Sequence, residues 1–212
     1  FWNWRFKSNV LKEVQLQLVE IDTAIVAHYA VCPVEFFVEG HLSNAALSMT
    51  TMTHPEHNGK GYFKQTANAL YGKMLNENYA FIYGFPNLNS HYGFKKSLRW
   101  CDIERIPTLQ ISSERLQLSS SNSSIAFHEI YTFDESHTLL CQKYTAEYKF
   151  KLNRNAAYLN WRYNEHPENK YFAFGDENGF VVYKKFLTPN GVEIDICELM
   201  VPSDETYMLN ML

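Results

Sequence analysis

Residues 53–63 read THPEHNGKGYF, a short stretch that holds two glycines, a lysine and a proline. Glycines beside a lysine are typical of phosphate binding. The nucleotide-triphosphate loop, however, requires Gly-Lys-Ser/Thr at its end, and here Gly61 is followed by Tyr62. The dinucleotide fingerprint G-x-G-x-x-G begins well with Gly59 and Gly61, but Lys64 takes the place of its third glycine. The segments around the stretch must therefore decide its role.

The stretch joins a predicted strand to a predicted helix. Residues 34–53 read as a hairpin that turns at Glu39 and Gly40, and residues 61–75 place apolar side chains at helical spacing. Backbone N–H groups at a helix N-terminus are unpaired, and the helix dipole adds roughly half a positive charge there. Glycines leave room for a phosphate close to the backbone. We expect a pyrophosphate at this loop, and the alternative is an ordinary glycine-rich turn.

Further strands are predicted at residues 14–21, 23–31 and 79–85, where β-branched and aromatic side chains are frequent. Residues 86–100 begin with a proline and cap-type residues and read as a short helix.

A short polar run, SSSNSS at residues 119–124, is the best candidate for a linker. It divides the chain into a first domain at residues 1–118 and a second at residues 125–212.

Composition narrows the classes of function. The chain has 212 residues with 46% hydrophobic residues and a net charge of −4, which argues against a general nucleic-acid surface. No apolar run reaches the length of a membrane helix, so we expect neither nucleic acid nor membrane as a partner. The scattered cysteines favour reduced thiols in a cytoplasmic protein and no metal site. They are Cys32, Cys101, Cys141 and Cys197.

The start of the chain recurs in its second half. Residues 1–6 read FWNWRF and residues 158–163 read YLNWRY. Strand-like segments follow both copies, and the proline of the glycine stretch has a counterpart in Pro202. The glycines and the lysine do not recur, because Ser203 stands there as a predicted N-cap with acids behind it. The second copy is thus predicted to repeat the fold without the site, and the alternative is a chance similarity.

These features together resemble the GNAT superfamily of acyl-CoA-dependent N-acyltransferases. Its signature is a strand, a bulge with a proline, and then [Gln/Arg]-x-x-Gly-x-[Gly/Ala] opening a long helix. Gly61 matches the central glycine, while Asn58 replaces the usual Gln or Arg and Phe63 the usual small residue. Residues 86–100 resemble the second signature, whose start is matched by Asn87 and Ser90.

The resemblance implies an α/β (α+β) fold with a mixed, largely antiparallel central sheet flanked by helices. It also implies a second, partial GNAT-like half, as in tandem two-copy members with W-[KR]-Y segments. Acetyl-CoA, the acyl-donor co-substrate, would lie where the sheet opens at the glycine loop. The residues that the resemblance places at this cofactor are Met52, Thr53, His54, Asn58, Gly59, Lys60, Gly61, Tyr62, Phe63, Asn87 and Ser90.

The catalytic residues are less well defined. The family often supplies a proton for the leaving thiolate from a tyrosine in the second signature helix, where this sequence has Phe94. Tyr92 is the candidate general acid, and its alternative role is that of a structural aromatic residue. Residues 41–53 contain no Asp or Glu, so Glu39 and His54 are the candidate bases, with a solvated turn residue and a packed histidine as the alternatives.

We therefore expect an N-acetyltransferase that acts on the amine of a small molecule such as an amino sugar. The aromatic residues Phe36, Phe37, Tyr83 and Tyr92 would suit such an acceptor. The alternatives are a non-catalytic acyl-CoA binder or scaffold, and an aminoacyl transferase of the peptidoglycan-bridge type. The sequence does not determine the acceptor or the oligomeric state.

Overall fold

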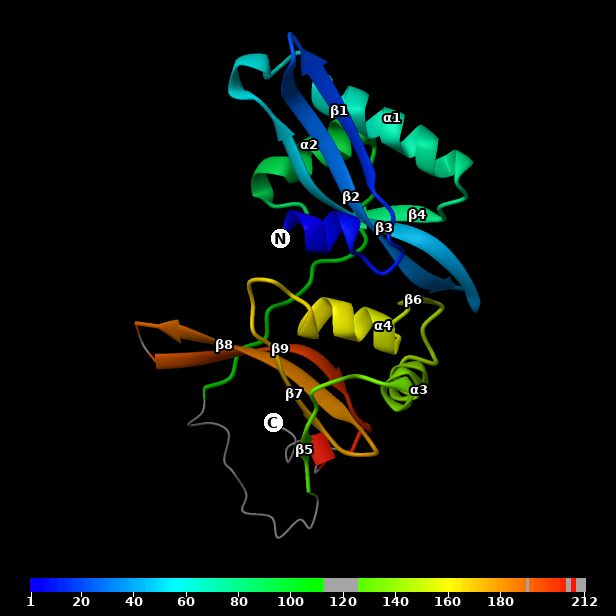
Figure 1. Ribbon diagram of the computed structural model, residues 1–212, viewed down its shortest axis with the longest axis vertical. Helices are drawn as coiled ribbons and strands as arrows, with labels where there is room; N and C mark the ends of the chain where they lie inside the picture. Colours follow the sequence, from blue (N-terminus) through cyan, green and yellow to red (C-terminus); the bar gives the residue numbers. More distant parts are fainter. Residues whose placement is uncertain (113–125, 190, 205–206, 209–212) are drawn as a thin grey trace. The chain divides into compact units, whose positions relative to one another are not determined.

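The computed structural model divides the chain into two compact units (Figure 1). The first unit comprises Phe1–Ile103 and Lys149–Asn153, and the second comprises Glu104–Tyr148 and Arg154–Leu212. The predicted linker at residues 119–124 lies outside the residues that the structure describes. The described residues are 1–112, 126–189, 191–204 and 207–208.

The division differs from the predicted domains of residues 1–118 and 125–212 in two respects. The first unit ends at Ile103 and not at residue 118. Residues 149–153 return to the first unit because strand β6 (Phe150–Leu152) pairs with β2 of that unit. A strand as short as β6 shows no recognisable pattern in its own sequence, because pairing with the long strand β2 stabilises it.

The sheet of the first unit has the strand order β1-β2-β3-β4, and β6 continues the β1 edge of β2. All pairs are antiparallel except β3 with β4, which is parallel. This is the mixed, largely antiparallel sheet that the sequence predicted. The bounds are β1 Gln15–Ile21, β2 Ala24–Val38, β3 His41–Thr53 and β4 Phe81–Gly84.

The long hairpin of β2 and β3 has its turn at the predicted place. Glu39 has φ 50° and Gly40 has φ 88°, the pair of positive angles that a two-residue turn of type I′ requires. The turn therefore fixes the register in which Val38 lies opposite His41.

Helices cover the two faces of this sheet. On one face, α1 (Tyr62–Asn76) and α2 (Leu88–Leu98) bury Leu70, Met74 and Phe94 against Tyr29 of β2. On the other face lies η1 (Asn3–Lys7), a π-helical turn, in which the backbone oxygen of Arg5 accepts from the Cys32 thiol at 3.5 Å. A 3-10 turn, η2 (Pro55–His57), lies between β3 and α1.

The second unit has a four-stranded antiparallel sheet of order β5-β7-β8-β9. Its core gathers Leu159, Phe180 and Val182, all fully buried, with Phe133 and Tyr163 beside them. The bounds are β5 His128–Glu129, β7 Phe172–Gly175, β8 Phe180–Thr188, β9 Gly191–Met200, α3 Glu135–Tyr144, α4 Ala156–Leu159 and η3 Asn160–Asn164.

The two Asn-Trp-Arg segments form the same local structure. Both η1 and η3 are π-helical turns, and each closes on its asparagine: the Ser8 amide donates to the Asn3 carbonyl and the Glu165 amide to the Asn160 carbonyl. The tryptophan of each turn is buried, and an antiparallel run of strands follows (β1-β2-β3 and β7-β8-β9). Isolated π turns are rare in proteins, so a shared one is a specific likeness.

Candidate functional site

The glycine loop joins β3 to α1 through η2, as the sequence predicted. Gly59 has φ 78° and Gly61 has φ 81°, a backbone conformation that side chains rarely adopt. A Cβ atom added at either glycine would meet nothing within 4 Å. The space in front of the loop is therefore open, and on one side Lys60 Nζ lies 3.2 Å from His57 Nδ1.

The start of α1 offers unpaired backbone donors. Gly61 is the N-cap residue and provides no side-chain cap, and the first turn contains no acid. The first intrahelical bond runs from the Gln65 amide to the Gly61 carbonyl at 3.0 Å. The amides of Tyr62, Phe63 and Lys64 thus lie in the first turn, where an α-helix gives them no partner. An anion in front of the loop would receive these hydrogen bonds and the field of the helix dipole.

The sheet opens beside this loop. β3 pairs with β4 only from Ala45 to Ser48, where Ser48 lies opposite Gly84, yet β3 continues to Thr53. A bulge at Thr50, which has φ 47°, shifts the register between β3 and β2 in the same segment. Residues 49–53 therefore have β2 on one side and leave the other edge to a ligand that pairs as an extended strand.

Three residues at and just after the end of β3 were predicted to contact the cofactor. Met52 and Thr53 lie in the part of β3 that extends beyond β4. The amide of His54, in contrast, already donates to the Val26 carbonyl at 2.7 Å. The side chain of His54 is also engaged, because its Nδ1 accepts from the Glu56 amide at 3.3 Å. Of the two candidate bases, His54 thus serves to cap η2.

The other candidate base lies at the wrong end of β3. Glu39 is in the hairpin turn that precedes β3, whereas the glycine loop follows it. A strand of 13 residues spans roughly 40 Å, so the Glu39 carboxylate is far from the loop. A base at this turn would not be close to the glycine loop, and the role of Glu39 as a base stays a prediction.

Asn87 and Ser90 lie at the start of α2. The Asn87 side chain caps this helix, accepting from the amides of Asn89 at 3.1 Å and Ser90 at 3.0 Å. The Ser90 hydroxyl donates to the same Asn87 oxygen at 3.1 Å. Both side chains are thus used to begin the helix, and their contact with a cofactor stays a prediction.

Tyr92 and Phe94 point in different directions from α2. Tyr92 is 66% exposed, and its hydroxyl accepts from Lys96 Nζ at 2.5 Å. Phe94 is buried, with its ring centroid 4.6 Å from that of Trp100. The position where the resemblance expects a proton donor is therefore part of the apolar core, and the role of Tyr92 as the general acid stays a prediction.

The predicted aromatic wall is only partly assembled. The rings of Phe36 and Tyr83 lie 5.2 Å apart between centroids. Phe37 is the next residue along β2, so its side chain emerges on the opposite face of the sheet, and Tyr92 is on the exposed side of α2. Of the four residues, Phe36 and Tyr83 are thus brought into contact.

Sequence reasoning missed a chain of buried hydroxyl groups beneath α1. The Tyr29 hydroxyl lies 2.7 Å from Ser48 Oγ and 2.8 Å from the Tyr71 hydroxyl, which in turn accepts from Trp100 Nε1 at 3.0 Å. Burial raises the pKa of both tyrosines, so both remain protonated at neutral pH. No local signal connects residues so far apart, and an excess of aromatic residues was the only hint.

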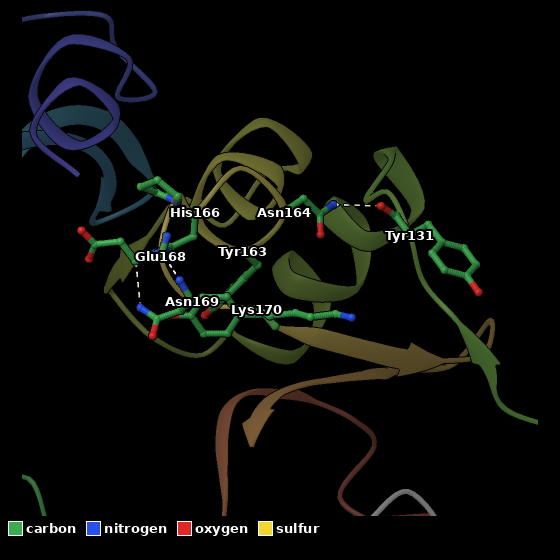
Figure 2. Close-up of a pocket in the computed structure, with 9 residues that line it drawn as sticks. Tyr131, Tyr163, Asn164, His166, Glu168, Asn169 and Lys170 are labelled. Carbon is green, nitrogen blue, oxygen red and sulfur yellow. Dashed lines mark hydrogen bonds between the residues drawn. The ribbon is translucent and has the colours of Figure 1, made fainter. Parts of the chain in front are cut away.

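A cavity of about 470 Å³ lies in the second unit (Figure 2). Tyr163 and Tyr171 form part of its wall, and His166 Nδ1 accepts from the amides of Glu168 and Asn169, so this loop is closed by its own side chain. The cavity includes none of the residues that the sequence predicted for the cofactor. Its lining is Tyr131, Tyr163, Asn164, His166, Pro167, Glu168, Asn169, Lys170 and Tyr171.

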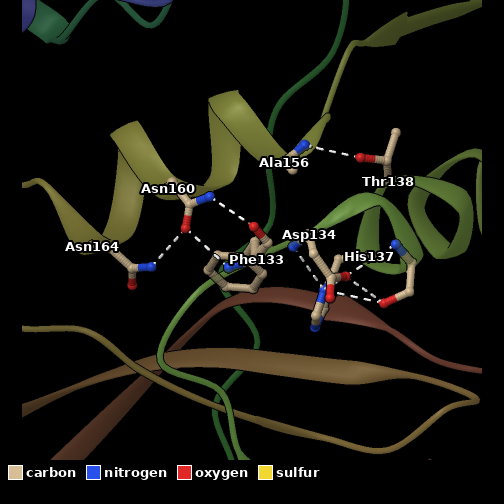
Figure 3. Close-up of polar contacts among 8 residues, drawn as sticks. Phe133, Asp134, His137, Thr138, Ala156, Asn160 and Asn164 are labelled. Atoms are coloured by element: carbon tan, nitrogen blue, oxygen red, sulfur yellow. Dashed lines mark hydrogen bonds and ion pairs between the residues drawn. The ribbon is translucent and has the colours of Figure 1, made fainter.

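Polar contacts near η3 are structural in kind (Figure 3). Asn160 accepts from the Phe133 amide at 2.9 Å and donates to the Phe133 carbonyl at 2.8 Å, which fixes the chain just before α3. Asp134 caps α3, and its hydrogen bonds with Ser136 and His137 lower its pKa to about 2. These contacts satisfy helix ends and leave no group positioned for chemistry.

Two further predictions are that the chain has no metal site and no membrane helix, and the structure bears on them only for the residues that it describes. Within these residues, no group of three or more His, Cys, Asp or Glu side chains is placed to hold a metal ion. Nor does any helix in the same residues have the length and apolar character needed to cross a membrane. All four cysteines are free thiols, and burial raises the pKa of Cys141 to about 12.

Comparison with known proteins agrees with this geometry. Residues 2–100 match the family model described as an acetyltransferase (GNAT) domain, which is just under half of the chain. The matched residues fall within the first unit, which contains the glycine loop and α2. No curated protein matches the chain by sequence.

Solved structures show the same fold. A GCN5-related N-acetyltransferase from Kribbella flavida has 14% sequence identity and a TM-score of 0.64, with 93% of this chain and 48% of that chain covered. A GCN5-related N-acetyltransferase from Anabaena variabilis ATCC 29413 has 11% identity and a TM-score of 0.62, with 89% of this chain and 49% of that chain covered. The likeness extends over both units, and the chain spans about half the length of these two proteins.

Proposed function

We propose that the chain is an acyl-CoA-dependent N-acetyltransferase that transfers the acetyl group of acetyl-CoA to the amine of a small molecule such as an amino sugar. One observation carries the proposal: the positive-φ glycines open α1 beside the point where β3 and β4 stop pairing. The loop provides donors for a pyrophosphate, and the open edge of β3 provides backbone groups for an extended arm.

The first-turn amides and Lys60 would hold the phosphates in this proposal. Residues 49–53 would pair with the amide groups of the pantetheine arm. The site fits the group because the region in front of Gly59 and Gly61 is open and no side-chain cap occupies the amides of α1. When bound, acetyl-CoA supplies an activated acyl group with a thiolate as the leaving group. The chain's own part is to hold this thioester and the neutral amine in line.

The substitution Gly61→Asp tests this arrangement. An aspartate side chain would project into the open space and oppose the phosphates, and loss of a charge-assisted contact is worth roughly 1.5–3 kcal/mol. We expect at least about a tenfold rise in the Kd for acetyl-CoA, since 1.4 kcal/mol is a factor of ten. Calorimetric titration measures it.

Two control variants distinguish the effect of the added charge from the effects of backbone strain and of the position on α1. Gly61→Asn is isosteric with Gly61→Asp and tolerates the left-handed conformation equally well, so it should retain more affinity. Gly72→Asp adds the same charge to α1 at an exposed position with open space around it and should change the Kd by less than about twofold. Equal affinity of the two Gly61 variants and the unaltered chain would mean that the loop is only a turn.

A second function, non-catalytic acyl-CoA binding, is supported by one observation. Phe94 is buried in the core at the position where the resemblance expects an acid, and residues 41–53 contain no carboxylate. A turnover assay with glucosamine and a panel of amines, read as release of free CoA, distinguishes the two functions. Binding without release on any amine would favour the scaffold.

We further propose that the second unit is a degenerate copy of the same fold. The shared π turns and the antiparallel strands behind them support this. The chain after β9, where residues 207–208 are helical, differs from the start of α1, because Asp204 Oδ1 accepts from the Tyr207 amide at 2.7 Å. This corrects the prediction that Ser203 is the N-cap residue. A carboxylate thus takes the amide that a phosphate would require, and we infer that this unit does not bind acetyl-CoA.

A further inference from the structure

The hydroxyl chain of the first unit contains one hydrogen bond whose direction is fixed. An indole N–H can only donate, so Trp100 Nε1 donates to the Tyr71 oxygen. The other partner of the Tyr71 hydroxyl is that of Tyr29, and the other partner of Tyr29 is Ser48 Oγ. If each tyrosine passes its hydrogen on, Tyr71 donates to Tyr29 and Tyr29 donates to Ser48.

The opposite direction is less favourable. In it, Ser48 would donate to Tyr29 and Tyr29 to Tyr71, and the described contacts would leave the Tyr71 hydrogen without an acceptor. Tyr71 and Ser48 are both half-buried, but hydrogen bonds that all run one way polarise one another. The opposite direction would break this series at Tyr71, which would accept two hydrogen bonds and donate none. The favoured direction keeps the series unbroken and places the spare hydrogen on Ser48.

Ser48 lies at the point where the sheet opens. It forms the last β3–β4 pair with Gly84, and beyond it the open edge of β3 begins. A Cβ atom on Gly84 would lie 3.3 Å from Ser48 Cβ and 3.2 Å from the Trp100 ring, so the glycine permits this close packing. The spare hydrogen is therefore held beside the place where an extended acyl-CoA arm would end.

We propose that the Ser48 hydroxyl donates a hydrogen bond to the sulfur of the leaving group in acetyl transfer, and that Tyr29 and Tyr71 are positioning residues that orient it. This inference rests on the proposed function. The amine nitrogen forms a bond to the carbonyl carbon, the C–S bond breaks, and its electron pair stays on sulfur. Ser48 keeps its proton, and the proton of the amine passes to water.

Physical reasons favour an aligned hydroxyl chain at such a site. Hydrogen bonds in series polarise one another, and donors fixed in advance stabilise developing charge without reorganisation. The chain also accounts for the buried Phe94, whose ring centroid is 6.3 Å from that of Tyr29. The hydroxyl chain would supply, from β2 and β3, the donor that α2 lacks.

The test measures the ionisation of bound CoA rather than activity alone. Free CoA is titrated on the full chain, and thiolate absorbance reports the pKa of the bound thiol. In Ser48→Ala this pKa should rise by about one unit relative to the unaltered chain, the shift that one charge-assisted hydrogen bond supports. Ser48→Thr keeps the hydroxyl and should restore it. Tyr71→Phe should give a smaller rise, because the Tyr29 hydrogen is then free to turn away from Ser48.

The results distinguish a failure of this inference from a failure of the proposed function. The Kd for acetyl-CoA should stay within about twofold in all three variants, while the kcat for glucosamine, where it is a substrate, falls about tenfold in Ser48→Ala. An unchanged pKa of bound CoA in both Ser48→Ala and Tyr71→Phe would overturn this inference and leave the proposed function standing. Failure of the unaltered chain to bind CoA at millimolar concentration would overturn both.

Discussion

After β3 the first unit enters α1 through Gly61, whereas after β9 the second unit enters its next helical turn through Asp204. Gly61 has no side chain and leaves the first-turn amides unoccupied by any cap, while the Asp204 carboxylate accepts from the Tyr207 amide. A helix start can therefore be completed by its own side chain or kept open for a ligand. The comparison teaches that two units can share a strand pattern and still differ in the proposed phosphate site, since a few residues at the helix start distinguish them.

The π turns show what the two units share. Trp4 is 7% exposed and Trp161 is 3% exposed, and each is followed two residues later by a second buried aromatic residue, Phe6 or Tyr163. Asn160 also holds the backbone of Phe133 through two hydrogen bonds, whereas Asn3 is exposed. The turn thus serves each unit's core, and its asparagine has a further role in the second unit.

The largest expected effect comes from removing either tryptophan. Truncation of a buried indole to Ala costs about 3–5 kcal/mol. Trp161→Ala should lower the free energy of unfolding of the second unit by this amount and leave acetyl-CoA affinity in the folded first unit. Trp4→Ala should lower both the stability of the first unit and the binding. Urea denaturation and calorimetric titration of the full chain measure the two effects.

One result would contradict this comparison of the two units. If Trp161→Ala abolished acetyl-CoA binding in protein whose first unit is fully folded, the second unit would contribute to the site. The proposed division into a first unit that binds acetyl-CoA and a second unit that does not would then be wrong.

A smaller effect is expected from an ion pair in the second unit. Arg154 Nε donates to Glu198 Oε1 at 3.0 Å, and the buried Tyr163 hydroxyl donates to the same oxygen at 2.9 Å. Glu198→Ala would leave the Arg154 guanidinium without its partner. We expect the free energy of unfolding to fall by about 3 kcal/mol, the lower end of the range for a broken buried pair, because Arg154 is partly exposed.

The matched control is Glu198→Gln, which keeps an acceptor for the Tyr163 hydroxyl and should cost less. Stability is measured by urea denaturation. Equal stability of Glu198→Ala and the unaltered chain would show that the pair contributes nothing to this unit.

The smallest effect concerns the cap of α3, a helix that, unlike α1, is capped by a side chain. Asp134→Ala should cost about 1 kcal/mol at neutral pH. The folded pKa of Asp134, about 2, lies below its ordinary value of 3.8, so its contribution is present above pH 4 and is lost as the pH falls toward 2. Denaturation at pH 7 and pH 3 should show the variant's deficit shrinking at the lower pH. A deficit equal at both values would mean that the carboxylate charge plays no part.

Much of the first unit could be predicted from local sequence. The Glu39–Gly40 turn, the helix that begins after Gly61, and the strand at Phe81–Gly84 all have clear patterns of turn residues or apolar spacing. The open edge of β3 could not be seen, because it depends on where the pairing with β4 ends. The hydroxyl chain from Trp100 to Ser48 is likewise a product of the fold, since its members come from α1, β2, β3 and the segment after α2.

The helix start of the second unit shows a finer limit. Ser203 and Asp204 are both good cap residues, and the sequence favoured the first while the structure uses the second. Either residue predicts a filled helix start, so the inferred contrast with Gly61 did not depend on the choice.

The most direct test of this contrast is a calorimetric titration of acetyl-CoA into the full chain. We predict one site per chain, weakened at least about tenfold by Gly61→Asp and unchanged by Asp204→Asn, which keeps an acceptor for the Tyr207 amide. Two sites per chain, no binding at millimolar acetyl-CoA, or one site that is insensitive to Gly61→Asp would contradict the account.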